Sequence, residues 1–78
     1  MSEAVCIDLN GKGITDRIIV NRLKALKLPR QPSVIDLRFN NLYLDGLRFV
    51  VDFLHTRPAV SACVGENFFH FEPFFRVY

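Results

Sequence analysis

Two aspartates, Asp8 and Asp36, are the residues of this chain whose repetition could support acid–base chemistry. They lie in the segments Ile7-Asp8-Leu9 and Ile35-Asp36-Leu37, which are 28 residues apart. Carboxylates on neighbouring strands can shift each other's pKa values enough to transfer protons. An open sheet offers no pocket that excludes water, however. We therefore interpret the pair, together with Arg38, as a solvent-facing polar surface for a partner.

A cysteine and a histidine could also form a nucleophile and its base. Cys63 would need His55 or His70 for this role, and neither spacing matches a catalytic motif. The two cysteines, Cys6 and Cys63, form no Cys-x-x-Cys pair, which argues against zinc-finger and thioredoxin-like sites. We predict a protein that is not an enzyme and that has no catalytic residue, cofactor or metal.

Basic residues are concentrated in one segment. The formal net charge is only +2, but residues 17–30 carry five basic side chains and no acidic one. Arg22, Lys24, Lys27 and Arg30 could therefore contact a nucleic acid, and this is the alternative function. No aromatic residue is interleaved in the segment, which weakens the case for base stacking.

Aromatic residues are concentrated at the other end of the chain. Five of the eight Phe residues lie between residues 68 and 75. Large apolar side chains that are hard to bury locally mark interaction surfaces. We predict that a protein partner, within a multi-subunit complex, buries six side chains: Phe49, Phe53, Phe68, Phe71, Phe74 and Phe75. The alternative for the aromatic tail is that it folds over the open end of its own domain as a cap.

Three repeated segments position these side chains within a single domain. Each begins with a short apolar run that alternates with polar residues, as in a half-buried strand. We predict strands at residues 5–9, 34–37 and 61–64. The repeats span approximately residues 4–31, 32–58 and 59–69, and an aromatic tail follows at 70–78.

Helices follow the first two strands. Apolar residues recur at helical spacing up to about residue 27 in the first repeat and over residues 46–55 in the second. Thr15 or Asp16 is the expected N-cap of the first helix, and Asp45 that of the second. No helical period fits after the third strand. Strands that alternate with helices predict an α/β fold with a parallel sheet.

The repeats resemble those of leucine-rich repeat proteins of the ribonuclease-inhibitor type. The strand consensus of that family is L-x-x-L-x-L-x-x-N-x-L. Its five defined positions are occupied by Ala4, Ile7, Leu9, Lys12 and Ile14, then by Pro32, Ile35, Leu37, Asn40 and Leu42, and then by Ala59, Ala62, Val64, Asn67 and Phe69. The spacings of 28 and 27 residues suit the helix-bearing subclass of the family.

The resemblance implies a solenoid that binds proteins, chiefly through its parallel strands, and it implies no catalysis. We expect Asn40 to satisfy backbone groups within its own repeat as the chain leaves the sheet. Lys12 cannot do the same, so the first repeat is expected to be a capping unit. Such solenoids normally need three or more repeats, so this chain is expected to be a fragment or a small subunit of a larger assembly.

The composition indicates how much apolar surface the chain must bury and in which compartment it lies. Half of the 78 residues are hydrophobic and the mean hydropathy is +0.18, which is high for so small a domain. Cys6 and Cys63 would lie about 9–10 Å apart on the first and third strands, too far for a disulfide. The chain shows no secretory signal and no apolar run of about 20 residues that could span a membrane. We predict an intracellular protein, cytoplasmic or organellar and not secreted.

Overall fold

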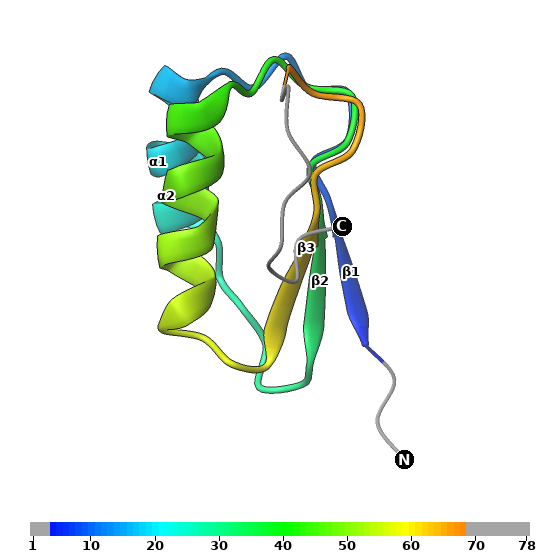
Figure 1. Ribbon diagram of the computed structural model, residues 1–78. Helices are drawn as coiled ribbons and strands as arrows, with labels where there is room; N and C mark the ends of the chain where they lie inside the picture. The colour runs from blue at the N-terminus through cyan, green and yellow to red at the C-terminus, as the bar shows by residue number, and fades with distance from the viewer. Residues whose placement is uncertain (1–3, 69–78) are drawn as a thin grey trace.

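The computed structural model describes residues 4–68 as a small α/β unit with three parallel strands and two helices. The strands lie side by side in chain order, β1-β2-β3 (Figure 1). This confirms the predicted parallel sheet and its alternation with helices. In order along the chain, the elements are β1 (Val5–Asp8), α1 (Asp16–Ala25), β2 (Ser33–Asp36), α2 (Leu44–His55) and β3 (Val60–Cys63).

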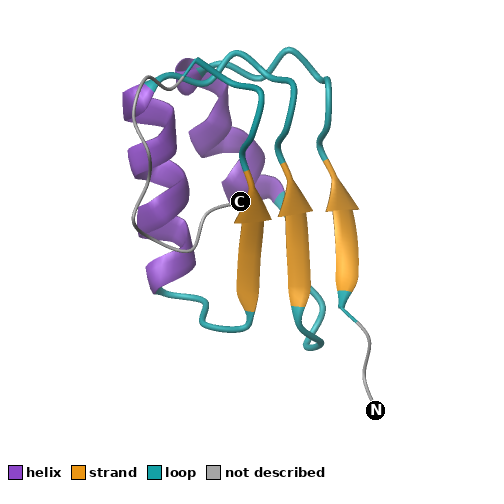
Figure 2. Cartoon of the chain, turned by 45° about the vertical axis from the view of Figure 1, so that its right-hand side comes forward, coloured by secondary structure: helices purple, strands orange, loops and turns teal. Residues whose placement is uncertain are grey.

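The two helices cover one face of the sheet, and the other face is left open by the described elements (Figure 2). Alternation along the strands follows from this arrangement. In β2, Ser33 and Ile35 are buried, whereas Val34 and Asp36, which alternate with them, are half-buried. The strands begin and end within one residue of the predicted positions, which is the usual uncertainty of a strand boundary.

The register repeats at both strand pairs. Val5 is aligned with Ser33, and Ser33 with Val60. The row at the carboxyl end of the strands consists of Asp8, Asp36 and Cys63. The sequence repeat of 28 and then 27 residues is therefore also a repeat in space.

Backbone hydrogen bonds outside the strands are the same at the two junctions between repeats. At the first junction the N–H groups of Val5, Leu9, Gly11 and Asn41 donate to the carbonyls of Pro32, Asp36, Arg38 and Ile14, at 2.8–3.1 Å. At the second junction the N–H groups of Ser33, Leu37, Phe39 and Phe68 donate to the carbonyls of Ala59, Cys63, Gly65 and Leu42, at 2.8–3.3 Å. Each bond at the second junction corresponds to one bond at the first junction, with donor and acceptor both moved along the chain by one repeat.

The turn after each strand also has a repeated backbone conformation. Gly11, Phe39 and Glu66 occupy the same position in the three repeats, with φ of 61°, 58° and 58°. Glycine adopts this left-handed conformation without cost, whereas Phe39 and Glu66 have a Cβ that disfavours it. The repeated hydrogen bonds therefore hold two turns in a conformation that their own residues do not favour.

Helix α2 begins earlier than predicted. Its N-cap is Tyr43, and Asp45 lies in the first turn, so the prediction of Asp45 as the cap is wrong. Thr15, one of the two predicted residues, is the N-cap of α1, but its side chain makes no capping hydrogen bond. Instead Asp16, in the first turn of α1, accepts the backbone N–H of Tyr43 at 2.7 Å. A carboxylate of one repeat thus helps to fix the start of the helix in the next.

The core lies between the sheet and the two helices. Ile14, Ile19, Ile35, Leu37, Leu42 and Ala62 are fully buried, and Leu23, Leu47, Val50 and Val64 are nearly so. Leu37 is fully buried, whereas Leu9, which follows the edge strand β1, is only half-buried. None of the helices in the described part is long and apolar enough to cross a membrane.

Candidate interaction surfaces

Asn40 joins the first and second repeats. Its side-chain oxygen accepts the backbone N–H groups of Lys12 at 3.0 Å and of Ile14 at 2.9 Å. Its amide nitrogen donates to the carbonyls of Leu37 at 2.9 Å and Arg38 at 3.3 Å. The predicted bonds within its own repeat are therefore present.

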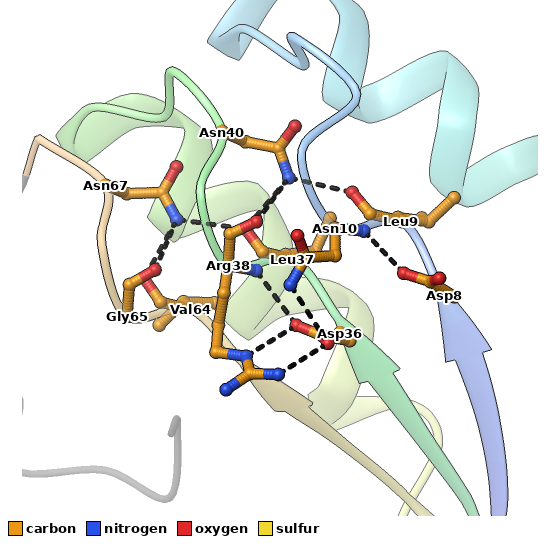
Figure 3. A network of polar contacts seen from close by, with 10 residues as sticks. All are labelled: Asp8, Leu9, Asn10, Asp36, Leu37, Arg38, Asn40, Val64, Gly65 and Asn67. Atoms are coloured by element: carbon orange, nitrogen blue, oxygen red, sulfur yellow. Dashed lines mark hydrogen bonds and ion pairs between the residues drawn. The ribbon is translucent and has the colours of Figure 1, made fainter.

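The same amide also reaches the first repeat, which the sequence did not predict. The Asn40 amide nitrogen donates to the carbonyl of Leu9 at 2.8 Å (Figure 3). Asn40 is 4% exposed, so its side-chain amide depends on these protein partners for its hydrogen bonds. Asn40 thus acts as a clamp between two repeats.

Asn67 makes the corresponding contacts one repeat further on. Its oxygen accepts the N–H of Leu42 at 2.9 Å. Its amide nitrogen donates to Leu37 at 3.0 Å, Val64 at 2.9 Å and Gly65 at 3.2 Å (Figure 3). The Leu9 carbonyl accepts the amide of Asn40 from the next repeat, and the Leu37 carbonyl accepts that of Asn67 in the same way. Two asparagines therefore form the start of a ladder that runs across the ends of the strands.

Polar residues meet on the open face of the sheet, where the strands end. Asp36 accepts two hydrogen bonds from the guanidinium of Arg38, both at 3.0 Å. Asn10 bridges the two aspartates, because its backbone N–H donates to Asp8 at 2.9 Å and its side chain donates to Asp36 at 3.3 Å (Figure 3). The predicted neighbours Asp8 and Asp36 do lie side by side.

The charges at this surface are arranged to keep Asp36 ionised. The hydrogen bond from the Arg38 side chain is the main cause that lowers the pKa of Asp36 from 3.8 to about 2. The same contact raises the pKa of the Arg38 guanidinium. A pair of aspartates that shares a proton needs the pKa of one carboxyl raised, and the shift at Asp36 has the opposite sign.

The two cysteines are free thiols and lie on different rows of the open face. Cys63 is half-buried beside Asp36, and Cys6 is exposed in the row that also contains Val34 and Ser61. His55 ends α2 near the end of the sheet at which the strands begin, whereas Cys63 ends β3 at the other end, where the strands finish (Figure 1). The described residues therefore do not pair Cys63 with His55, and His70 lies outside them.

The described phenylalanines of the predicted binding set lie away from the polar face. Phe49 is 43% exposed on α2. Phe53, one helical turn further, is half-buried against the core, and the Arg57 guanidinium lies 4.0 Å from the centre of its ring. The core and Arg57 therefore already cover part of the Phe53 ring, which leaves less of it for a partner to bury.

Phe68, in the loop after β3, is 43% exposed and stacks on Tyr43, with ring centroids 4.8 Å apart. Phe71, Phe74 and Phe75 lie outside the described residues. Exposed apolar residues that the sequence analysis did not select are Ile18, Phe39, Tyr43 and Leu44. The signal for Tyr43 and Leu44 was their place immediately before the apolar arc of α2.

The basic residues of the alternative site are all exposed. Arg22 and Lys24 lie in the last turns of α1, and Lys27 and Arg30 follow in the loop to β2. Within residues 4–68 the one ion pair joins Arg38 to Asp36, so none of these four is neutralised by a described acidic residue. Residues 4–68 contain no group of three or more His, Cys, Asp or Glu side chains arranged to hold a metal ion.

Comparison with known proteins gives no identification. No protein-family model, no curated protein and no solved structure matches the chain.

Proposed function

We propose that this chain is a leucine-rich repeat unit of the ribonuclease-inhibitor type that binds protein partners and is not an enzyme. In this proposal it acts inside the cell, in the cytoplasm or an organelle, as one unit of a larger assembly. The partner would contact the apolar side chains of α2 and of the chain from Phe68 onward, and the polar residues of the open strand face.

The two asparagines support the choice of family. The family consensus places an asparagine three residues after the third leucine of the strand motif, and Asn40 and Asn67 occupy that position. Each side chain accepts a backbone N–H of the preceding repeat and donates to a carbonyl of that repeat, at equivalent positions. A repeated, structurally specific bond pattern is stronger support than the spacing of apolar residues alone.

The observation that carries the binding function is the exposure of large aromatic side chains in a protein of this size. Phe49 and Phe68 are each 43% exposed, and Tyr43, which stacks on Phe68, is 54% exposed. Aromatic side chains contribute large areas to interfaces, at about 150–250 Å² for each ring. Their exposure favours a surface that a partner covers.

The open face supports a binding role over a catalytic one. Asp36 is held as an anion by Arg38, and Asn10 connects it to Asp8. Such a pair can present charge and hydrogen-bond acceptors to a basic group of a partner. It is poorly suited to proton transfer, because a group with a pKa of about 2 is a weak base near neutral pH.

The test compares matched variants in affinity capture from a cell extract. We expect Phe49→Ser and Phe68→Ser to reduce the recovery of proteins that the unmodified chain retains. Arg22→Ser and Lys24→Ser, which change exposed residues of α1, serve as controls and should not reduce that recovery. Circular dichroism would first establish that all four variants fold.

The salt dependence of binding distinguishes the alternative. The affinity of a protein that makes 6–10 phosphate contacts falls about 10³- to 10⁵-fold between roughly 50 and 200 mM salt. Binding through apolar contacts shows no such fall. Binding that falls steeply with salt, is destroyed by nuclease and is lost in Arg22→Ser or Lys24→Ser would replace the proposal with nucleic-acid binding by Arg22, Lys24, Lys27 and Arg30.

A further inference from the structure

The middle repeat shows what the ladder looks like when neighbours are present on both sides. The carbonyl of Leu37 accepts two side-chain amides, one from Asn40 of its own repeat at 2.9 Å and one from Asn67 of the next at 3.0 Å. Leu37 is fully buried. A complete step of the ladder therefore consists of one carbonyl and two asparagines.

The first repeat cannot complete such a step with its own residues. The Leu9 carbonyl accepts the amide of Asn40 from the next repeat at 2.8 Å. The ladder position of its own repeat is Lys12, whose side chain carries N–H donors and no acceptor. The Asn40 oxygen also accepts the N–H of Ile14, and the Asn67 oxygen accepts that of Leu42, whereas a lysine side chain has no acceptor for such a bond.

The third repeat is in the opposite situation. Its own asparagine is present, because Asn67 donates to the carbonyl of Val64 at 2.9 Å. Among the described residues, that carbonyl receives no second amide from a following repeat. The step at Val64 is therefore complete on its own side and lacks only the neighbour's contribution.

The strand edge shows the same polarity. Leu37 donates its N–H to Cys63 of the following strand at 2.8 Å, and Leu9 donates in the same way to Asp36 at 2.9 Å. Val64 occupies the equivalent position in the third repeat, and β3 is the last strand of the described sheet. Repetition of the pattern directs the Val64 N–H towards the next strand position.

We propose that the β3 edge binds a strand-and-turn repeat of another polypeptide that carries an asparagine at the ladder position, and that Lys12 keeps a second copy of this chain from taking that place. The inference rests on the proposed function, because it specifies the kind of partner. Continuity with the two internal junctions is its main argument. A docked repeat would make the same backbone and amide bonds a third time.

A copy of this chain can be converted into a test partner by one substitution. Lys12→Asn gives the first repeat the amide that the β3 edge requires. In the register of the sheet, Cys6 shares a row with Val34 and Ser61. Cys6 of a docked copy would therefore lie beside Ser61 of the receiving copy, at the strand spacing of about 4.8 Å.

Disulfide formation reports this geometry. With Ser61→Cys introduced and Cys63→Ser removing the native thiol, Cys6 and the new thiol are two strands apart within one chain and cannot join. Between docked copies they are neighbours within the reach of about 7 Å that a disulfide requires. Oxidation of the full chain should therefore give covalent dimers and longer covalent oligomers, which we call cross-linked ladders, only when copies dock in register.

We expect the Lys12→Asn chain to form these ladders at a concentration at least about tenfold lower than the chain with Lys12, which corresponds to about 1.4 kcal/mol. Lys12→Ala, which removes the charge without adding an amide, should behave like Lys12. Equal cross-linking of all three chains would overturn the role of Lys12. No cross-linking of the Lys12→Asn chain would overturn docking at β3.

Two further results separate this inference from the proposed function. If ladders form only after residues 69–78 are deleted, those residues and not another polypeptide occupy the edge, and the inference is overturned. If the edge fails in every variant while Phe49→Ser and Phe68→Ser still reduce partner capture, the protein-binding function stands without it.

Discussion

Replacement of Asn40 by alanine is the most informative single change in the described fold. The substitution removes every hydrogen bond that its side chain makes to the first and second repeats. The groups left behind are not equivalent. The carbonyl of Leu37 still accepts the amide of Asn67. The N–H of Lys12 and the carbonyl of Arg38 belong to exposed residues, so water can replace the bond that each of them loses.

The N–H of Ile14 is the group that determines the magnitude. Ile14 is fully buried, and Asn40 is the acceptor of its N–H. An unsatisfied buried donor costs about 1–3 kcal/mol. In a domain of fewer than 100 residues each kcal/mol lowers the melting temperature by about 4–8 °C. We therefore expect the melting temperature of Asn40→Ala to fall by about 4 °C or more.

The matched control is Asn41→Ala, one residue further along the same turn. Asn41 is exposed, and its structural bond to Ile14 is made by its backbone N–H, which alanine retains. The control should change the free energy of unfolding by less than about 0.5 kcal/mol. Urea titrations followed by circular dichroism would measure both variants. Equal stability of Asn40→Ala and Asn41→Ala would refute the clamp between repeats.

Three other predictions follow from single contacts. Leu37→Ala should destabilise the fold by about 2–5 kcal/mol in the same titration, because Leu37 is fully buried, and a loss below 1 kcal/mol would contradict its central place. Gly46→Ala should be destabilising even though alanine favours a helix by about 1 kcal/mol, because its Cβ would collide with the Asp16 carboxylate that accepts the Tyr43 N–H. Asp16→Ala should reduce that penalty, and an unchanged penalty would exclude the collision as its cause. Arg38→Ala should raise the pKa of Asp36 from about 2 towards 3.8 in a carboxyl-carbon NMR titration. The stabilisation by this contact is present above pH 3.8 and is lost as the pH falls towards 2, because the folded-state pKa is lowered.

The sequence predicted the repeats and the parallel strands because both depend on local periodicity. Ile35 and Leu37 alternate with polar residues, and the same alternation returns in the first and third repeats. The role of Asn40 in its own turn could be predicted in the same way. Its bonds to Leu9 and Ile14 could not, because sequence spacing does not reveal how closely the turns of adjacent repeats approach.

The start of α2 was missed for a related reason. Capping rules look for a polar side chain at the helix terminus itself, and they favour Asp45 over Tyr43. The carboxylate that accepts the Tyr43 N–H belongs to Asp16, 27 residues earlier. Phe53 is a similar case, since the cover that Arg57 gives to its ring depends on how the chain turns after α2.

We propose that another polypeptide covers the exposed apolar surface of this chain. Sedimentation of the isolated chain together with its thermal melt tests it most directly. We expect the isolated chain to associate, aggregate or unfold at or below body temperature, because no partner would then cover its exposed aromatic residues and its β3 edge. A monomer that melts cooperatively well above body temperature would contradict it.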